Sequence, residues 1–216
     1  MKQQEFTLYV FLASAFVAGL VTANVVAGKI IDLWGITVPA GVLAYSITFA
    51  ITDTLAEIWG RERAQTLVNA GFAVLLMTWG LIALAVHLPP APFWHNQEAF
   101  AAVLGPTNRI ILGSIVAYGA SQTFDVWIFH RIKVLLASRH LWLRNNVSTL
   151  LSQTLDTCLF ITIAFYGQFP LLPLIVGQLT VKYAIAVLDT PVVYGLVYLV
   201  RMRLRALSPE NTAAPG

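Results

Sequence analysis

The chain has little charge and a single cysteine. Of its 216 residues, 11% are charged and 58% are apolar, and the mean hydropathy is +0.75. A water-soluble domain does not keep a polar surface at this composition. The lone cysteine, Cys158, lies inside an apolar run, which excludes an internal disulfide and a cysteine metal site. The composition therefore indicates a protein that crosses the lipid bilayer several times.

Several enzyme motifs are also missing. No P-loop pattern occurs, so ATP hydrolysis by this chain is disfavoured. Paired aspartates in a membrane can perform acid and base chemistry. However, the chain has no Gly-x-Gly-Asp, His-Glu-x-x-His or Gly-x-Ser-x-Gly pattern. Its formal charge of +3 implies no nucleic-acid partner, because the placement of charge matters more than the total in membrane proteins. We expect no enzymatic activity, no cofactor and no metal site.

Apolar segments long enough to cross a bilayer, about 20 residues each, recur along the chain. They cover residues 6–27, 38–59, 66–88, 110–129, 147–167 and 172–200. The first has no signal-peptide cleavage pattern, so we interpret it as a retained helix. We predict an all-α polytopic membrane protein with six transmembrane helices in a single domain, residues 1–205. The small, polar residues 206–216 predict a disordered cytoplasmic tail.

The basic residues of the loops are distributed unevenly between the two predicted faces. One face holds Lys2, Arg61, Arg63, Arg131, Lys133, Arg139, Arg144, Arg201, Arg203 and Arg205, and the other holds Lys29 and Arg109. The positive-inside rule therefore predicts that both termini are cytoplasmic. An even number of transmembrane helices agrees with this, because it places both termini on the same side of the membrane.

Small residues recur every fourth position in the first segment, at Ala15, Gly19, Ala23 and Ala27. Such a stripe lets another helix approach closely, either inside the chain or on a partner protein. Asn24 lies beside the stripe. An amide within a span hydrogen-bonds a neighbouring helix or the solute, and the sequence leaves both open.

Two carboxylates interrupt the second segment. A carboxylate near the bilayer centre costs roughly 2.5 to 3.5 kcal/mol on insertion scales, so its presence indicates a functional site. Glu57 lies one turn before Arg61, which favours an ion pair between them. Asp53 lies deeper, roughly 6 Å past the helix midpoint, with no cation in the neighbouring turns. We predict that Asp53 contacts a solute or an ion, with Phe49 on or near the same face.

A short polar motif occurs twice. SQTFD at residues 121–125 ends the fourth segment, and SQTLD at residues 152–156 begins the fifth. Because these segments run in opposite directions, the two copies are expected at similar depth. On each helix the Ser, Gln and Asp share one broad face. This pattern predicts a paired polar wall of Gln122, Asp125, Gln153 and Asp156, with Tyr118 one turn above the first copy.

The sixth segment carries polar residues on one face: Gln178, Lys182 and Asp189 are four and seven residues apart. Asp189 is followed by Thr190 and Pro191, so it can stabilise a local break in the helix. Lys182 is the one cation deep in a predicted span. It can line a solute site, or it can form a buried ion pair that orients helices. The possible partners are Asp53, Asp125 and Asp156.

Five carboxylates against one lysine within the spans predict an acidic, amide-rich interior. Such an interior favours a cation or a solute with several hydrogen-bond donors. A carboxylate can accept two parallel N–H bonds from a guanine-like ring, and glutamine can bond the ring carbonyl. Phe49 or Tyr118 can stack on its face.

These residues belong to stretches that resemble the queuosine precursor transporter family, six-helix inner-membrane proteins also described as vitamin-uptake-type transporters. The matching stretches are TANVVAGK (22–29), PAGVLAY (39–45), TFAITDTLAEIWG (48–60), RIILGSIVAY (109–118) and SQTFD (121–125). Trp59 stands where the family more often has tyrosine. The resemblance implies a bacterial inner-membrane protein. It also implies uptake of the 7-deazaguanine precursors of queuosine, 7-cyano-7-deazaguanine or its aminomethyl relative.

We therefore predict a facilitator or secondary transporter that works by alternating access. The alternative is the substrate-binding membrane subunit of a multi-component vitamin importer, docked through the small-residue stripe of the first helix. The preferred precursor, the coupling ion and the oligomeric state, including a homo-oligomer, are left open. The predicted substrate-binding residues are Asn24, Phe49, Asp53, Glu57, Tyr118, Gln122, Asp125, Gln153, Asp156, Gln178 and Lys182.

Overall fold

The computed structural model describes residues 3–135 and 141–206, which form long helices and one short hairpin. The elements are α1 (Gln3–Val26), β1 (Ile30–Leu33), β2 (Ile36–Pro39), α2 (Gly41–Trp59), α3 (Arg61–His87), α4 (Gln97–Leu135), α5 (Leu141–Phe165) and α6 (Leu171–Ala206). Ala206, predicted as the first residue of the tail, ends α6. The rest of the predicted tail, with Lys2 and Arg139, lies outside the described residues.

Most of these helices can cross a membrane. Within the described chain, five stretches are long and apolar enough: Glu5–Val26, Gly41–Trp59, Arg61–His87, Gln97–Asp125 and Val147–Phe165. The remaining helix, α6, is 36 residues long and contains a shorter apolar stretch, Leu171–Ile185. The structure is therefore consistent with a multi-pass, all-α membrane protein, with five described helices long and apolar enough to cross. The sixth crossing and the cytoplasmic termini stay predictions.

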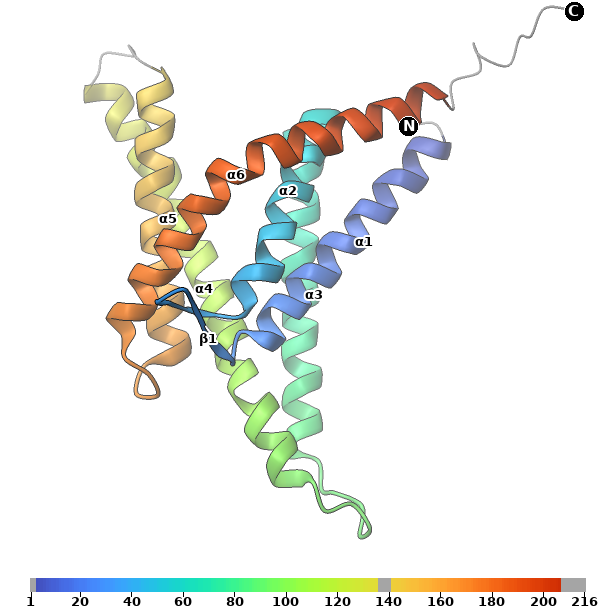
Figure 1. The fold of residues 1–216 in the computed structure, drawn as a ribbon, viewed down its shortest axis with the longest axis vertical. Helices are drawn as coiled ribbons and strands as arrows, with labels where there is room; N and C mark the ends of the chain where they lie inside the picture. Colours follow the sequence, from blue (N-terminus) through green and yellow to red (C-terminus); the bar gives the residue numbers. More distant parts are fainter. Residues whose placement is uncertain (1–2, 136–140, 207–216) are drawn as a thin grey trace, which may run out of the picture.

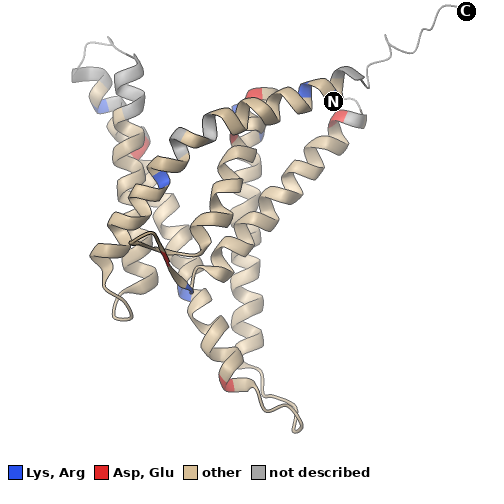
Figure 2. Cartoon of the chain, viewed as in Figure 1, with Lys and Arg blue, Asp and Glu red and all other residues tan. Residues whose placement is uncertain are grey.

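The helices alternate in direction, so the start of α1 and the end of α6 lie at the same end of the molecule (Figure 1). Several of the basic residues lie toward this end (Figure 2). Arg61 and Arg63 begin α3, Arg131 lies near the end of α4, and Arg201 and Arg203 lie near the end of α6. We call this the basic end. It carries the charge bias from which the cytoplasmic side was predicted.

The first connection is a β-hairpin, where the sequence predicted an irregular loop followed by a helix from residue 38. Strands β1 and β2 pair antiparallel, with Ile30 opposite Pro39. Trp34 and Gly35 form the turn with φ of 53° and 86°, the left-handed pair of a two-residue hairpin turn. The backbone N–H of Gly35 donates to Asp32 Oδ1 at 2.8 Å. Residues 38 and 39 are therefore strand, and α2 begins later than predicted.

A single glycine separates α2 from α3. Gly60 has φ of 91°, a backbone conformation that is energetically unfavourable for any residue with a side chain. It ends α2 after Trp59, and α3 begins directly at Arg61. The predicted basic turn at residues 61–63 is thus the first turn of α3. By contrast, α6 continues through Pro191 without the predicted break; the side chain of Asp189 lies outside the described residues.

The small-residue stripe of α1 packs inside the chain against α2. A Cβ on Gly19 would lie 3.2 Å from Thr48 Cγ2 of α2. In return, Gly41 at the start of α2 faces the backbone carbonyl of Ala23, and Ala23 and Ala27 are buried. Close approach of backbones is what small residues allow between membrane helices. The packing interpretation of the stripe is therefore confirmed.

This contact predicts that Gly41→Ala lowers stability. A Cβ at Gly41 would overlap the Ala23 carbonyl oxygen and lie 2.9 Å from Ala27 Cβ. We expect a loss of about 1–3 kcal/mol, as for other overpacked sites, measured as a lower midpoint of thermal unfolding in detergent. Gly80→Ala is the matched control, because a Cβ there meets nothing within 4 Å. Equal midpoints for the two variants would contradict the close contact.

Candidate substrate-binding site

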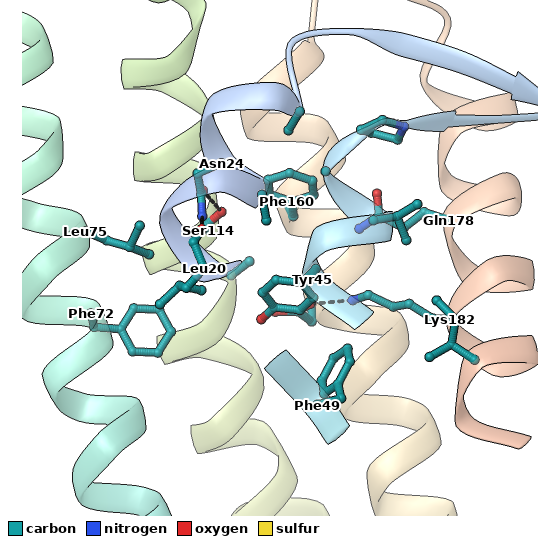
Figure 3. Close-up of a pocket in the computed structure, with 18 residues that line it drawn as sticks. Leu20, Asn24, Tyr45, Phe49, Phe72, Leu75, Ser114, Phe160, Gln178 and Lys182 are labelled. Atoms are coloured by element: carbon teal, nitrogen blue, oxygen red, sulfur yellow. Dashed lines mark hydrogen bonds and ion pairs between the residues drawn. The ribbon is translucent and has the colours of Figure 1, made fainter. Parts of the chain in front are cut away.

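A small cavity, which we call the inner chamber, lies where the helices meet (Figure 3). Its volume is about 60 Å³, and each of α1 to α6 contributes to its lining. Since one water needs roughly 10–15 Å³ by this measure, the chamber holds only a few waters in this conformation. The polar lining residues are Asn24, Tyr45, Ser114, Asp156, Gln178 and Lys182, and the aromatic ones include Phe49, Phe72 and Phe160.

Lys182 is the centre of the polar contacts. Its side chain is 7% exposed, and its Nζ donates to Asp156 Oδ2 at 2.8 Å and to Thr157 Oγ1 at 3.0 Å. A longer bond of 3.4 Å reaches Gln153 Oε1. Of the three aspartates left open by the sequence, Asp156 is thus the ion-pair partner. A buried charge needs such a partner, because desolvation otherwise makes its burial very costly.

The two SQTxD copies bond to each other crosswise. Ser152 of the second copy donates to Asp125 Oδ1 of the first at 3.1 Å. Ser121 of the first copy lies 3.5 Å from Asp156 Oδ1 of the second. This exchange requires α4 and α5 to run antiparallel with the two motifs at the same level. The predicted pairing is confirmed, although most of it joins the two helices rather than lining a cavity.

Asn24 bonds a neighbouring helix. Its Nδ2 donates to the Leu20 carbonyl at 2.9 Å, and its Oδ1 accepts a bond of 2.7 Å from Ser114 on α4. Asn24 also lines the inner chamber. The bond to a neighbouring helix is therefore confirmed, since Asn24 fixes α1 to α4. Its contact with a solute stays a prediction.

Gln178 borders the chamber with an unused acceptor. The residue is 8% exposed, and its Oε1 has no hydrogen-bond partner within the described part of the chain. A buried polar atom without a partner costs about 1–3 kcal/mol. Next to a cavity, such an atom is a contact point for a ligand that brings a donor.

A second and larger cavity, the outer cavity, adjoins the inner chamber toward the basic end. Its volume is about 830 Å³, within the range of small-molecule sites. Phe49, Lys182 and Ile185 line both spaces. These three residues therefore form the partition between the outer cavity and the inner chamber. Asp53 and Gln153, both predicted site residues, line the outer cavity.

Glu57 also lines the outer cavity, but its ion pair differs from the predicted one. Its Oε1 lies 2.9 Å from Arg201 Nη2 of α6, and both side chains are more than half exposed. The prediction of a bond to Arg61 assumed one continuous helix. Gly60 ends α2 between the two residues, so they do not share a helical face. Glu57 thus connects α2 to α6.

Three predicted site residues line neither of these two cavities. Tyr118 lies behind the inner chamber, where its ring stacks on Phe72 at 4.0 Å and its hydroxyl accepts a 3.0 Å bond from Gln65. Asp125 accepts the bond from Ser152, and Gln122 is exposed on α4. Tyr118 positions a lining residue, while Asp125 contributes to the contact between α4 and α5.

The charge of the interior also differs from the expectation. Asp156 is compensated by Lys182, and Arg61 and Arg201 line the outer cavity beside Asp53 and Glu57. Around both spaces, the described carboxylates and cations are balanced. Lining residues that the sequence reasoning missed as site residues include Tyr45, Phe72, Ser114 and Phe160. Spacing could have suggested two of them, since Tyr45 is four residues before Phe49 and Phe160 is four after Asp156.

The family described as "putative vitamin uptake transporter" matches residues 39–196, most of the chain and nearly all of the site. The chain belongs to this family. It is 34% identical over 179 residues to the "probable queuosine precursor transporter" of Bacillus subtilis (strain 168), covering 81% of this chain and 78% of that protein. It is 25% identical over 165 residues to the "queuosine precursor transporter" of Escherichia coli (strain K12), covering 76% and 72%. No solved structure matches.

The family confirms the resemblance inferred from the sequence motifs. Like its relatives, the chain is a multi-pass membrane transporter, and it is not an enzyme. Its two adjoining cavities are accordingly interpreted as parts of a path for a solute. An intramembrane catalytic site is no longer a competing interpretation of the aspartates.

Proposed function

We propose that the protein imports queuosine precursors, 7-cyano-7-deazaguanine, 7-aminomethyl-7-deazaguanine or both, across the bacterial inner membrane. The curated relatives are named for this substrate class. In this proposal the chain crosses the membrane six times with both termini in the cytoplasm. Transport occurs by alternating access, facilitated or coupled to an ion.

One observation carries the proposal: the inner chamber and the outer cavity share Phe49, Lys182 and Ile185. A movement of these side chains would join the two spaces. The outer cavity, lined by Arg61 and Arg201 at the basic end, is then the cytoplasmic exit. The chamber supplies aromatic faces for stacking, and acceptors on Asp156 and Gln178 for the N–H groups of a planar base.

Uptake of labelled precursor tests the site. In cells that lack endogenous synthesis, we expect Asp53→Asn to reduce uptake at least about tenfold, because a lost charged hydrogen bond is worth roughly 1.5–3 kcal/mol. Asp125→Asn should keep most activity, since its partner among the described residues is a serine outside both cavities. Asp32→Asn in the hairpin turn is the matched control.

Membrane abundance of each variant is measured by immunoblot. Normal uptake by Asp53→Asn at equal abundance would remove Asp53 from the path. If cells that express the unchanged protein take up neither precursor, the proposed function is wrong.

The alternative function is a substrate-binding subunit that depends on an energising partner. That proposal used the small-residue stripe of α1 as the docking face, and the stripe packs on α2 instead. We therefore favour an autonomous transporter. The purified chain in liposomes should carry labelled precursor alone, and flux that requires an added protein would reverse this preference.

A further inference from the structure

The inner chamber has no uncompensated charge among its described lining residues. Its one carboxylate, Asp156, and its one ammonium, Lys182, are 2.8 Å apart and bonded to each other. The other charged residues that line the outer cavity, such as Asp53 and Arg201, do not line the inner chamber. A solute in the chamber therefore meets a neutral pair held between apolar and aromatic walls.

A cationic solute would disturb this pair. A primary amine on a short alkyl arm is protonated at neutral pH, as lysine is. To be compensated in the chamber, it would have to take Asp156 from Lys182, which is 8% exposed and has Asp156 as its ion-pair partner. One of two cations would then remain without a counter-charge in a poorly solvated site, where like charges repel strongly.

A neutral base has no such difficulty. It can supply N–H donors to the free Oε1 of Gln178 and to the remaining lone pairs of Asp156 while the ion pair stays intact. Its plane can pack between aromatic residues such as Phe49 and Phe160. The contacts that a neutral base needs are thus present, whereas the one carboxylate of the chamber that could neutralise an ammonium is already paired with Lys182.

We propose that the inner chamber selects a neutral planar base over its aminomethyl, cationic counterpart, and that Lys182 is the residue that rejects the cation. This inference rests on the proposed function and deepens it. Specificity then comes from a repulsive element as well as from attractive contacts.

The test is parallel uptake of 7-cyano-7-deazaguanine and 7-aminomethyl-7-deazaguanine, each labelled, by cells that make neither. For the unchanged protein we expect an initial rate at least about tenfold higher for the cyano compound at equal concentration, as a like charge disfavours the cation. In Lys182→Met the ratio should fall or reverse, because Asp156 is then free to bind the ammonium. Lys29→Met, an exposed lysine after α1, is the matched control and should keep the original ratio.

Lys182→Arg keeps the positive charge and should keep the preference for the cyano compound. This variant is the second test if Lys182→Met does not accumulate in the membrane. Gln178→Leu should lower uptake of the cyano compound without favouring the amine. Equal or faster uptake of the aminomethyl compound by the unchanged protein overturns the inference and leaves the proposed function standing. An unchanged ratio in an abundant Lys182→Met overturns the role of Lys182. Uptake of neither compound overturns both proposals.

Discussion

Asp156→Ala should destabilise the protein more than any other substitution of a predicted site residue. It leaves Lys182 buried without its ion-pair partner, and breaking a buried pair in this way costs about 3–5 kcal/mol. The folded population in the membrane should fall sharply, and uptake should be abolished. The measurement is the midpoint of thermal unfolding in detergent, with uptake per folded molecule alongside.

The repeat supplies a matched control for this prediction. Asp125→Ala removes the corresponding aspartate of the other SQTxD copy, whose described partner is the neutral Ser152. We expect a loss of only about 1–2 kcal/mol, the cost of an unsatisfied hydroxyl. The double variant Asp156→Asn with Lys182→Met removes both charges and should recover most of the stability without recovering uptake. Equal losses in Asp156→Ala and Asp125→Ala would contradict a special role for the ion pair.

The sequence predicted the contact between α4 and α5 from two observations. The SQTxD motif occurs in both segments, and the two segments run in opposite directions. Two copies of one motif at the adjoining ends of two antiparallel segments have to face each other at one depth. The crossed bonds of Ser121 and Ser152 follow from that geometry. The same reasoning found Lys182 and Gln178, since polar residues four apart on an apolar helix share a face.

The sequence did not predict which of these residues line a cavity. Helical spacing shows on which face of a helix a residue lies. Whether that face borders a cavity depends on how far apart the neighbouring helices stand. Asp125 and Asp156 occupy equal positions in the repeat, yet only Asp156 reaches the chamber, because α6 brings Lys182 to that side. Phe72 gave no sequence signal, since an aromatic residue in an apolar segment has many possible roles.

Local backbone chemistry accounts for the other errors. The pairing of Glu57 with Arg61 failed because a left-handed glycine stands between them. The hairpin of β1 and β2 was missed because its strands are only four residues long and its turn is Trp-Gly rather than a common Asn-Gly or Asp-Gly pair. Both errors concern where an apolar segment begins or ends, and hydrophobicity alone does not set such boundaries.

The hairpin also closes the inner chamber at the end opposite the basic one. Strand β2 lies against α6 so closely that a Cβ on Gly177 would overlap the Thr37 carbonyl oxygen. Pro39 and Gly41 line the inner chamber just beyond this contact. The chamber is thus covered by packed backbone on the hairpin side and by three side chains toward the outer cavity. In the proposed alternating access, β2 would separate from α6 when the chamber opens outward.

We call the contact between β2 and α6 the seal. Gly177→Ala should therefore separate β2 from α6 and make residues buried in the seal accessible to solvent. A methyl group cannot fit in the present contact, and the resulting strain of about 1–3 kcal/mol favours the separated state by about 5- to 150-fold. Val38 is the reporter, because it is fully buried and lies beside Gly177. With Cys158 replaced by alanine, a membrane-impermeant maleimide added outside should label Val38→Cys slowly in the otherwise unchanged chain. It should label it many times faster when Gly177→Ala is added.

Two controls make the labelling decisive. Gly195→Ala, on the same helix with nothing within 4 Å of the added Cβ, should leave the labelling of Val38→Cys slow. Trp34→Cys, at a position that is 98% exposed in the hairpin turn, should react quickly in every background. If Trp34→Cys is protected from outside and reacts only after the membrane is opened, the predicted orientation is reversed. If Gly177→Ala leaves Val38→Cys as protected as before, the contact of β2 with α6 is not the seal, because a side chain forced into a closing contact must open it.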